Sequence, residues 1–166
     1  MKTADVIIVG SGASGLFNAL FLPQDYKVIV ITKKEVEESD SFLAQGGISA
    51  LKNPEDYDSY FEDTMKAGHY ENDKGAVEKM IKESPQIIQD LKDFGVRFDL
   101  KDGEIEFTRE GGHSTFRILH HEDLTGKEIT SHLYEEAKKR DNITIMENCT
   151  MIDIIEKDGE CKGIVY

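Results

Sequence analysis

The fold of this chain is decided by one stretch near its start, Asp5-Val6-Ile7-Ile8-Val9-Gly10-Ser11-Gly12-Ala13-Ser14-Gly15. Residues 6–9 are a short apolar, β-branched run, which is typical of a strand buried on both faces of a parallel sheet. Residues 10–15 match G-x-G-x-x-G. In this pattern the first Gly makes a tight turn, the second lets the backbone approach a diphosphate, and the third lets helix and strand pack closely.

The segments that follow complete a strand-helix-strand unit. A helical pattern runs from Ala13 to Pro23, and residues 27–31 form a second apolar run, so the unit occupies about thirty residues. A diphosphate in such a unit lies at the positive end of the helix dipole, where free N–H groups point at it. We therefore predict an α/β, Rossmann-like domain with a parallel central sheet that binds a dinucleotide.

The rest of the chain predicts further helices, a hairpin and a small β meander. Residues 39–50 are rich in Ser, Gly and Ala but contain Phe42, Leu43 and Ile48, which favours an ordered loop over a linker. The expected helices are 56–67, 73–94 and 125–139, with Asp73 as a cap and Pro85 as a break or kink. The expected strands are a hairpin within 96–107 around Asp102-Gly103, and residues 143–146, 151–156 and 163–166.

Length and charge restrict the class of protein. At 166 residues the chain is long enough for one domain, which we place at 1–166. It has 20 Lys and Arg against 33 Asp and Glu, a net charge of -13, which argues against nucleic-acid binding. We find no apolar run long enough for a membrane span and no leader, and expect a cytoplasmic protein. Cys149 and Cys161 have no metal-ligand spacing, so no metal site is predicted.

The second strand lacks the acidic residue that usually binds ribose in NAD sites about twenty residues after the glycines. Thr32 and Lys33 stand there instead. This weakens an ordinary NAD site and makes Thr32 and Lys33 the candidates for the ribose and adenine end of the cofactor. We interpret the nearby Glu35 as a solvated acid.

The segment Ser41-Phe42-Leu43-Ala44-Gln45-Gly46-Gly47-Ile48 resembles the S-x-x-A-Q-G-G-I segment of the succinate dehydrogenase, fumarate reductase and L-aspartate oxidase flavoproteins. The resemblance implies that the segment lines a flavin ring and that the cofactor is FAD. Gly46 and Gly47 permit close backbone approach, and Ser41 and Gln45 offer hydrogen bonds. The implied cofactor-binding residues are Gly10, Ser11, Gly12, Ala13, Ser14, Gly15, Thr32, Lys33, Asp40, Ser41, Ala44, Gln45, Gly46 and Gly47.

Two further details follow from this family. Its covalently flavinylated members carry a histidine where Asp40 stands here, and Asp cannot form that bond, so we expect non-covalent FAD. Met151 occupies a family position whose backbone meets the adenine.

The segment from Thr108 to His120 resembles the T-R-E-G-G-H-S-x-x-R-I-L-H signature of the L-aspartate oxidases in this family. A carboxylate beside a flavin suits the α-ammonium of aspartate, which succinate lacks, so we expect Glu110 to orient the amino acid. His113 either binds a substrate carboxylate or is structural, and the first is preferred. Arg117, His120 and His121 are interpreted as packing or surface residues.

The resemblance implies oxidation of L-aspartate to iminoaspartate, with electrons passing to oxygen or fumarate, in the biosynthesis of NAD. The family's catalytic arginine, capping domain and C-terminal helical domain have no counterpart in residues 1–166. We therefore expect an FAD-binding domain incomplete at its C-terminus and inactive alone. Two alternatives are a fumarate reductase-like dicarboxylate flavoprotein, and a non-catalytic FAD-binding fragment or half of a split enzyme that assembles with a complementary chain.

Overall fold

The computed structural model describes residues 2–166. Contacts along the chain divide it into two compact units. The first contains the residues up to Ala44 together with Gly126–Tyr166, and the second contains Gln45–Thr125.

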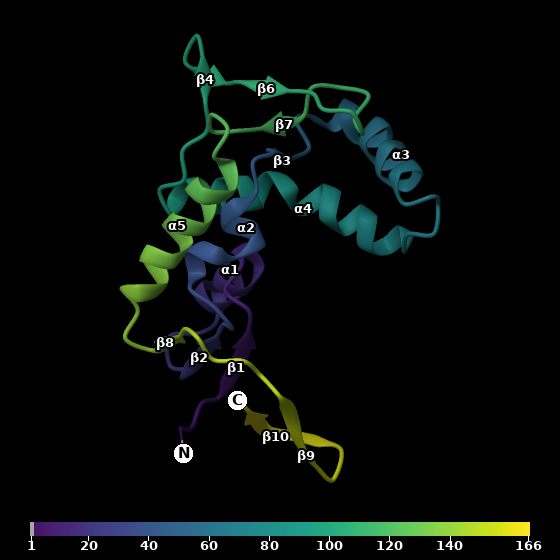
Figure 1. Ribbon diagram of the computed structural model, residues 1–166. Helices are drawn as coiled ribbons and strands as arrows, with labels where there is room; N and C mark the ends of the chain where they lie inside the picture. The colour runs from purple at the N-terminus through teal and green to yellow at the C-terminus, as the bar shows by residue number, and fades with distance from the viewer. Residues whose placement is uncertain (1) are drawn as a thin grey trace. The chain divides into compact units, whose positions relative to one another are not determined.

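A three-stranded parallel sheet forms the centre of the first unit (Figure 1). Its strands are β1 (Val6–Val9), β2 (Val28–Ile31) and β8 (Ile143–Met146), in the order β1-β2-β8. Every residue of β2, the central strand, is buried. Helix α1 (Ala13–Phe21) packs on β1 and β2 and buries Leu16, Ala19 and Leu20. The predicted strand-helix-strand unit and parallel sheet are confirmed. Strand β1, however, is not buried on both faces as expected: it lies at the edge of this three-stranded sheet, and Val9 is 52% exposed.

Shorter elements complete the first unit. The 3-10 helix η1 (Val36–Glu38) and helix α2 (Asp40–Leu43) follow β2, and α5 (Thr125–Lys138) precedes β8. The predicted ordered loop therefore contains a helical turn, which Ser39 caps by accepting a 3.3 Å hydrogen bond from the Phe42 N–H. Strands β9 (Asp153–Lys157) and β10 (Glu160–Val165) form an antiparallel hairpin.

The second unit combines small antiparallel sheets with two helices. Strands β3 (Ile48–Ser49), β7 (Ile118–Leu119) and β6 (Phe107–Thr108) pair in the order β3-β7-β6. Strands β4 (Leu100–Lys101) and β5 (Glu104–Ile105) form the predicted hairpin, with positive φ at Asp102 and Gly103. The two helices are α3 (Tyr57–Ala67) and α4 (Lys74–Asp93), and the short 3-10 helix η2 (Pro54–Asp56) leads directly into α3. Between α3 and α4 lies a buried cluster of Tyr60, Met65, Val77 and Ile81.

Helix α4 continues through Pro85, where a break or kink was expected. Proline has no N–H to donate to the carbonyl four residues earlier, which here is that of Ile81. The hydroxyl of Ser84 donates to this carbonyl at 2.7 Å and also accepts a 2.8 Å bond from the Leu51 N–H. The buried serine thus satisfies the acceptor that Pro85 leaves free, and the helix does not end there.

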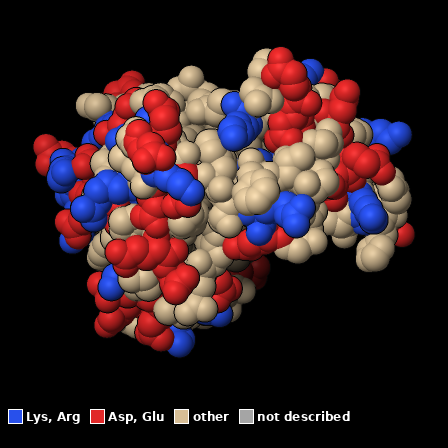
Figure 2. Space-filling model, turned by 90° about the horizontal axis from the view of Figure 1, so that it is seen from above, with Lys and Arg blue, Asp and Glu red and all other residues tan. Residues whose placement is uncertain are grey.

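Acidic and basic side chains are interspersed on the face shown in Figure 2, with acidic groups prominent. This agrees with the net charge of -13. No helix within residues 2–166 is long and apolar enough to cross a membrane.

The role of Ser84 predicts the effect of two substitutions. We expect Ser84→Ala to lower the free energy of unfolding by about 1–3 kcal/mol, because it leaves a buried carbonyl and a buried N–H without partners. In a Pro85→Ala background, residue 85 supplies its own N–H to the Ile81 carbonyl, so the cost of Ser84→Ala should shrink. Urea unfolding of the four variants measures this difference. An equal cost in both backgrounds would show that the hydroxyl does not replace the missing donor.

Candidate cofactor and substrate sites

The turn from Gly10 to Gly15 has the backbone that the glycine pattern requires. Gly10 has a φ of +112°, and its N–H donates to the carbonyl of Ile31 at 2.8 Å. A Cβ on Gly15 would lie 2.1 Å from the Gly10 carbonyl oxygen, and one on Gly12 would lie 2.8 Å from Ser41 Oγ. A side chain is therefore excluded at Gly15, where helix meets strand, and one at Gly12 would have to displace the Ser41 hydroxyl.

The start of α1 is open to an anion. Gly12 is its N-cap, no side chain caps it, and its first turn, which includes Ala13 and Ser14, carries no acid. The first N–H groups of a helix have no partner within it and attract negative charge. Beside them, the Ser11 hydroxyl is among the buried polar atoms of residues 2–166 that have no hydrogen-bond partner, and Ser11 is only 2% exposed. A buried hydroxyl without a partner is rare and suits a ligand oxygen.

A cavity of about 460 Å³ lies at this turn, a size typical of cofactor and ligand sites. Three groups of residues line it: the glycine turn, the segments at the carboxyl ends of β2 and β8, and α2 with its cap. The predicted residues Thr32, Lys33, Asp40, Ser41 and Met151 are all among them. Backbone bonds join the strand ends, since the Thr32 N–H donates to Met146 at 3.0 Å and its carbonyl accepts from Cys149 at 2.9 Å.

The cavity is also lined by residues that the sequence did not predict to bind the cofactor: Lys34, Glu35, Glu38, Cys149 and Thr150. Glu35 is exposed, as expected of a solvated acid, yet it stands at this cavity. Lys34 forms a 2.6 Å ion pair with Glu38. The sequence signal that could have identified these five residues is their position after β2 and β8, because ligands bind at the carboxyl ends of parallel strands. The turn, the unpaired hydroxyl and the cavity together fit the adenosine diphosphate portion of FAD.

The signature segment 44–47 lies at the division between the two units. In the first unit, the Ala44 carbonyl accepts a 3.1 Å bond from the Gly126 N–H at the start of α5. In the second unit, a Cβ on Gly47 would lie 2.3 Å from the Leu119 carbonyl oxygen, so only glycine fits there. A Cβ on Gly46 would lie 3.8 Å from Glu110 Oε2. The second unit thus brings Gly46 beside the predicted substrate residue Glu110. Gln45, the remaining predicted residue of the segment, is exposed.

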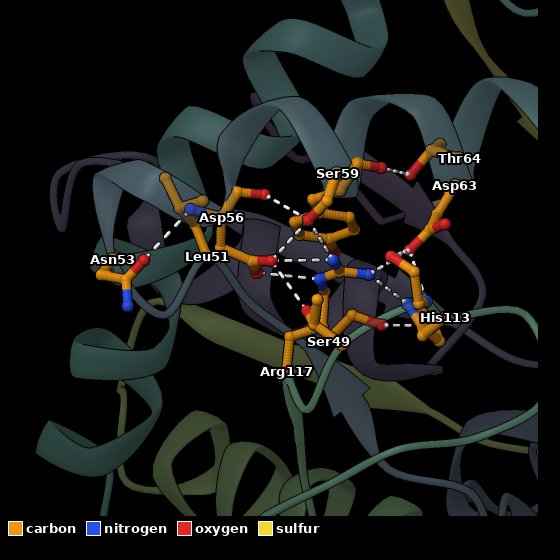
Figure 3. Close-up of polar contacts among 12 residues, drawn as sticks. Ser49, Leu51, Asn53, Asp56, Ser59, Asp63, Thr64, His113 and Arg117 are labelled. Carbon is orange, nitrogen blue, oxygen red and sulfur yellow. Dashed lines mark hydrogen bonds and ion pairs between the residues drawn. The ribbon is translucent and has the colours of Figure 1, made fainter.

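Arg117 is completely buried. It lies at the centre of a cluster of polar contacts that includes His113 (Figure 3). Its Nε and Nη2 donate to the two carboxylate oxygens of Asp56 at 2.9 and 2.8 Å. Its Nη1 donates to Asp63 at 2.6 Å, and Nη2 also donates to Ser59 at 2.8 Å. The guanidinium lies 4.8 Å from the centre of the Tyr60 ring. The packing role expected for Arg117 is confirmed.

The pKa values of this cluster follow from these bonds. Hydrogen bonds from Arg117 hold the pKa of Asp56 well below its ordinary value, and Asp56 in turn raises the pKa of Arg117. Burial alone would raise the pKa of Asp63, but bonds from the Ser114 backbone and from Arg117 outweigh burial and lower it. All three groups are therefore charged at neutral pH.

Asp56 and Asp63 also hold the segment that follows the candidate substrate residues Glu110 and His113. Asp63 accepts bonds from the Ser114 N–H and hydroxyl at 2.7 and 2.8 Å, and Asp56 accepts a 2.7 Å bond from the Thr115 hydroxyl. Asp56 and Asp63 are seven residues apart and lie two turns apart along η2 and α3. Nothing in the sequence marked them, because acids at this spacing are common on exposed helix faces.

His113 contacts this cluster through both ring nitrogens. Nδ1 lies 3.1 Å from Arg117 Nη1, and Nε2 lies 3.4 Å from Ser49 Oγ. His120 and His121 both pair with Asp99, at 3.1 and 3.3 Å, which agrees with their expected structural role. The Thr125 hydroxyl accepts a 3.0 Å bond from the His121 N–H.

Comparison with known proteins identifies the family. Residues 5–166 match the family described as the FAD binding domain. The chain belongs to this FAD-binding family. FAD is therefore the cofactor of its fold, as the glycine turn and the two signature segments predicted.

The relatives within the family agree with the predicted resemblance. The chain is 42% identical to the L-aspartate oxidase of Clostridium perfringens over 99% of its length, and 46% identical to that of Clostridium acetobutylicum over 96%. It spans 38% and 37% of those proteins. Among solved structures, it is similar to E. coli quinol fumarate reductase, with a TM-score of 0.90 and 25% identity over 97% of this chain and 28% of that one. It is also similar to Mycobacterium smegmatis Sdh1, with a TM-score of 0.86 and 28% identity over 98% and 30%.

The buried cluster predicts how stability depends on Arg117. Arg117→Met leaves two carboxylates without their cation, so we expect the free energy of unfolding at pH 7 to fall by about 3–5 kcal/mol. Arg109→Met is the matched control, because Arg109 is exposed, and it should change stability by less than about 0.5 kcal/mol.

The same cluster predicts how the free energy of unfolding depends on pH. The folded-state pKa values of Asp56 and Asp63 are lowered, so their contribution is complete above the unfolded value of about 4 and is lost as the pH falls below it. Denaturant unfolding between pH 3 and 7 should show this loss in the wild type and in Arg109→Met, and a weaker loss in Arg117→Met. An equal loss of unfolding free energy in all three proteins would show that the pairing of Arg117 with Asp56 and Asp63 is not its cause.

Proposed function

We propose that this chain forms the FAD-binding part of an L-aspartate oxidase-type enzyme. The reaction is oxidation of L-aspartate to iminoaspartate, with oxygen or fumarate as electron acceptor, in the cytoplasmic biosynthesis of NAD. The observation that carries the proposal is the placement of Glu110 beside Gly46, which joins the two signature segments. Relatives named L-aspartate oxidase at 42% and 46% identity support it.

The residues of the first unit bind and orient the cofactor. The N–H groups at the start of α1 and the Ser11 hydroxyl receive the diphosphate, and Thr32, Lys33 and Met151 flank the adenosine. Bound FAD supplies the acceptor for the hydride of the substrate. Asp40 has no nucleophilic nitrogen with which to attach a flavin, so the cofactor is held without a covalent bond.

Glu110 distinguishes an amino-acid substrate from a simple dicarboxylate. Its carboxylate is exposed, so it is accessible to a ligand cation. The α-ammonium of L-aspartate pairs with such a carboxylate, whereas succinate has no cation to offer it. A fumarate reductase-like dicarboxylate enzyme is the second candidate, because the similarity in structure to quinol fumarate reductase favours it. Glu110 argues for the first.

Turnover also requires cations for the two carboxylates of the substrate. Arg117 is buried and committed to Asp56 and Asp63, so it is not available to a ligand. We propose that other cations come from a complementary chain or segment, and that residues 1–166 alone bind FAD without turning over aspartate.

The glycine turn predicts the effect of Gly12→Ala on FAD binding. The added methyl group falls between the turn and Ser41, where the backbone must approach the diphosphate. We expect the Kd for FAD, measured by quenching of flavin fluorescence, to rise at least tenfold, a loss of about 1.4 kcal/mol. Gly75→Ala, in the first turn of α4 and outside the cavity, is the control and should bind FAD as the wild type does.

Attachment of the cofactor is tested by denaturation. We expect trichloroacetic acid to release all flavin from the loaded chain into the supernatant, because Asp40 replaces the histidine that could form a covalent bond. A yellow precipitate that survives washing contradicts non-covalent binding.

The role of Glu110 predicts a preference between ligands. On the FAD-loaded chain, L-aspartate should perturb the flavin absorbance at lower concentration than succinate does. Glu110→Gln removes a charge-assisted bond worth about 1.5–3 kcal/mol, so the preference should fall roughly tenfold or more. Glu104→Gln, in the exposed hairpin, should keep it. If L-aspartate and succinate perturb the flavin absorbance at the same concentration, the result favours the dicarboxylate alternative.

A further inference from the structure

We propose that Arg117 is a positioning residue that fixes the tautomer of His113, so that its Nε2–H is the donor available to a substrate carboxylate. The purpose of this arrangement rests on the proposed function. The tautomer itself does not, because it follows from contacts within the second unit.

The contact between Arg117 and His113 decides where the imidazole proton lies. A guanidinium has five N–H donors and no acceptor. With Nη1 at 3.1 Å from Nδ1, the histidine nitrogen must be the acceptor and cannot carry a proton. A neutral imidazole has one proton, which is therefore on Nε2. The imidazolium form would place two donors against each other and would break the contact.

The arginine cannot turn away from this contact, because its other donors are engaged. Asp56 binds Nε and Nη2, Ser59 binds Nη2, and Asp63 shares Nη1 with His113. The side chain is fully buried. Tyr60 lies below the guanidinium and meets the imidazole edge-on, with ring centres 6.2 Å apart. The groups around His113 thus form a fixed support on its Nδ1 side.

The other side of the ring is held weakly. Nε2 lies 3.4 Å from Ser49 Oγ, a long contact in which Nε2 donates and the hydroxyl accepts. A carboxylate oxygen is a stronger acceptor than a hydroxyl and can replace it at low cost. His113 then recognises a substrate carboxylate through a neutral N–H donor, while Glu110, three residues earlier, receives the ammonium. This gives His113 the carboxylate-binding role that its sequence position left open.

The tautomer can be measured directly on the unmodified chain. The sequence has five histidines, so long-range ¹H–¹⁵N correlation spectra of ¹⁵N-histidine-labelled protein at neutral pH are tractable. His113→Gln identifies the signals of His113 by their loss. We expect the Nε2-protonated pattern for His113. The Nδ1-protonated pattern, or that of an imidazolium, overturns the proposal.

Variants of Arg117 test the cause. Arg117→Met should give a mixture of tautomers at His113, Arg117→Lys should retain part of the bias, and Arg109→Met should leave the wild-type pattern. An unchanged tautomer in folded Arg117→Met overturns the positioning role. If Arg117→Met does not fold, the wild-type spectrum and Arg117→Lys decide the question.

Adding L-aspartate to the FAD-loaded chain separates this proposal from the proposed function. A shift of the Nε2 signal with the Nδ1 signal unchanged supports binding of the substrate carboxylate at Nε2. If the wild type shows the Nε2-protonated pattern but neither L-aspartate nor succinate moves Nε2, the carboxylate role fails while the control of the tautomer by Arg117 stands.

Discussion

The close approach of Gly15 to the carbonyl of Gly10 is the constraint on which the cofactor site depends. A Cβ at residue 15 would lie 2.1 Å from that oxygen, so any side chain would push α1 away from the end of β1. With glycine there, the N–H groups of the first turn of α1 stand at the carboxyl ends of β1 and β2. The buried Ser11 hydroxyl and the cavity lined by the ends of β2 and β8 lie at the same turn.

The second unit is organised around charge instead of backbone approach. One fully buried arginine joins Asp56 and Asp63 to His113, and the same carboxylates hold Ser114 and Thr115. Removing any one of these side chains leaves a buried charge or a buried hydrogen-bond donor without a partner. The cluster therefore stabilises the fold only when it is complete. This explains how a segment rich in glycine, 108–117, keeps a defined path without long strands.

Much of the fold could be predicted because its signals are local. The apolar runs of β1 and β2, the glycine turn, and the Asp-Gly pair at 102–103 each act within a few residues, and the structure has strands and turns at these places. Helix α2 and strand β3 have four and two residues, too few for a periodic pattern. The continuity of α4 depends on the hydrogen bond from the Ser84 hydroxyl to the Ile81 carbonyl, which helix propensities do not predict. The pairing of Arg117 with Asp56 and Asp63 spans more than fifty residues, so only the folded chain reveals it.

The most direct test of the account is a crystal structure of this chain with FAD. We expect the diphosphate at the start of α1, with an oxygen accepting from the Ser11 hydroxyl, and the adenosine between the segments that follow β2 and β8, near Thr32 and Met151. A diphosphate bound away from the Gly10–Gly15 turn, or a Ser11 hydroxyl still without a partner in the complex, would contradict it.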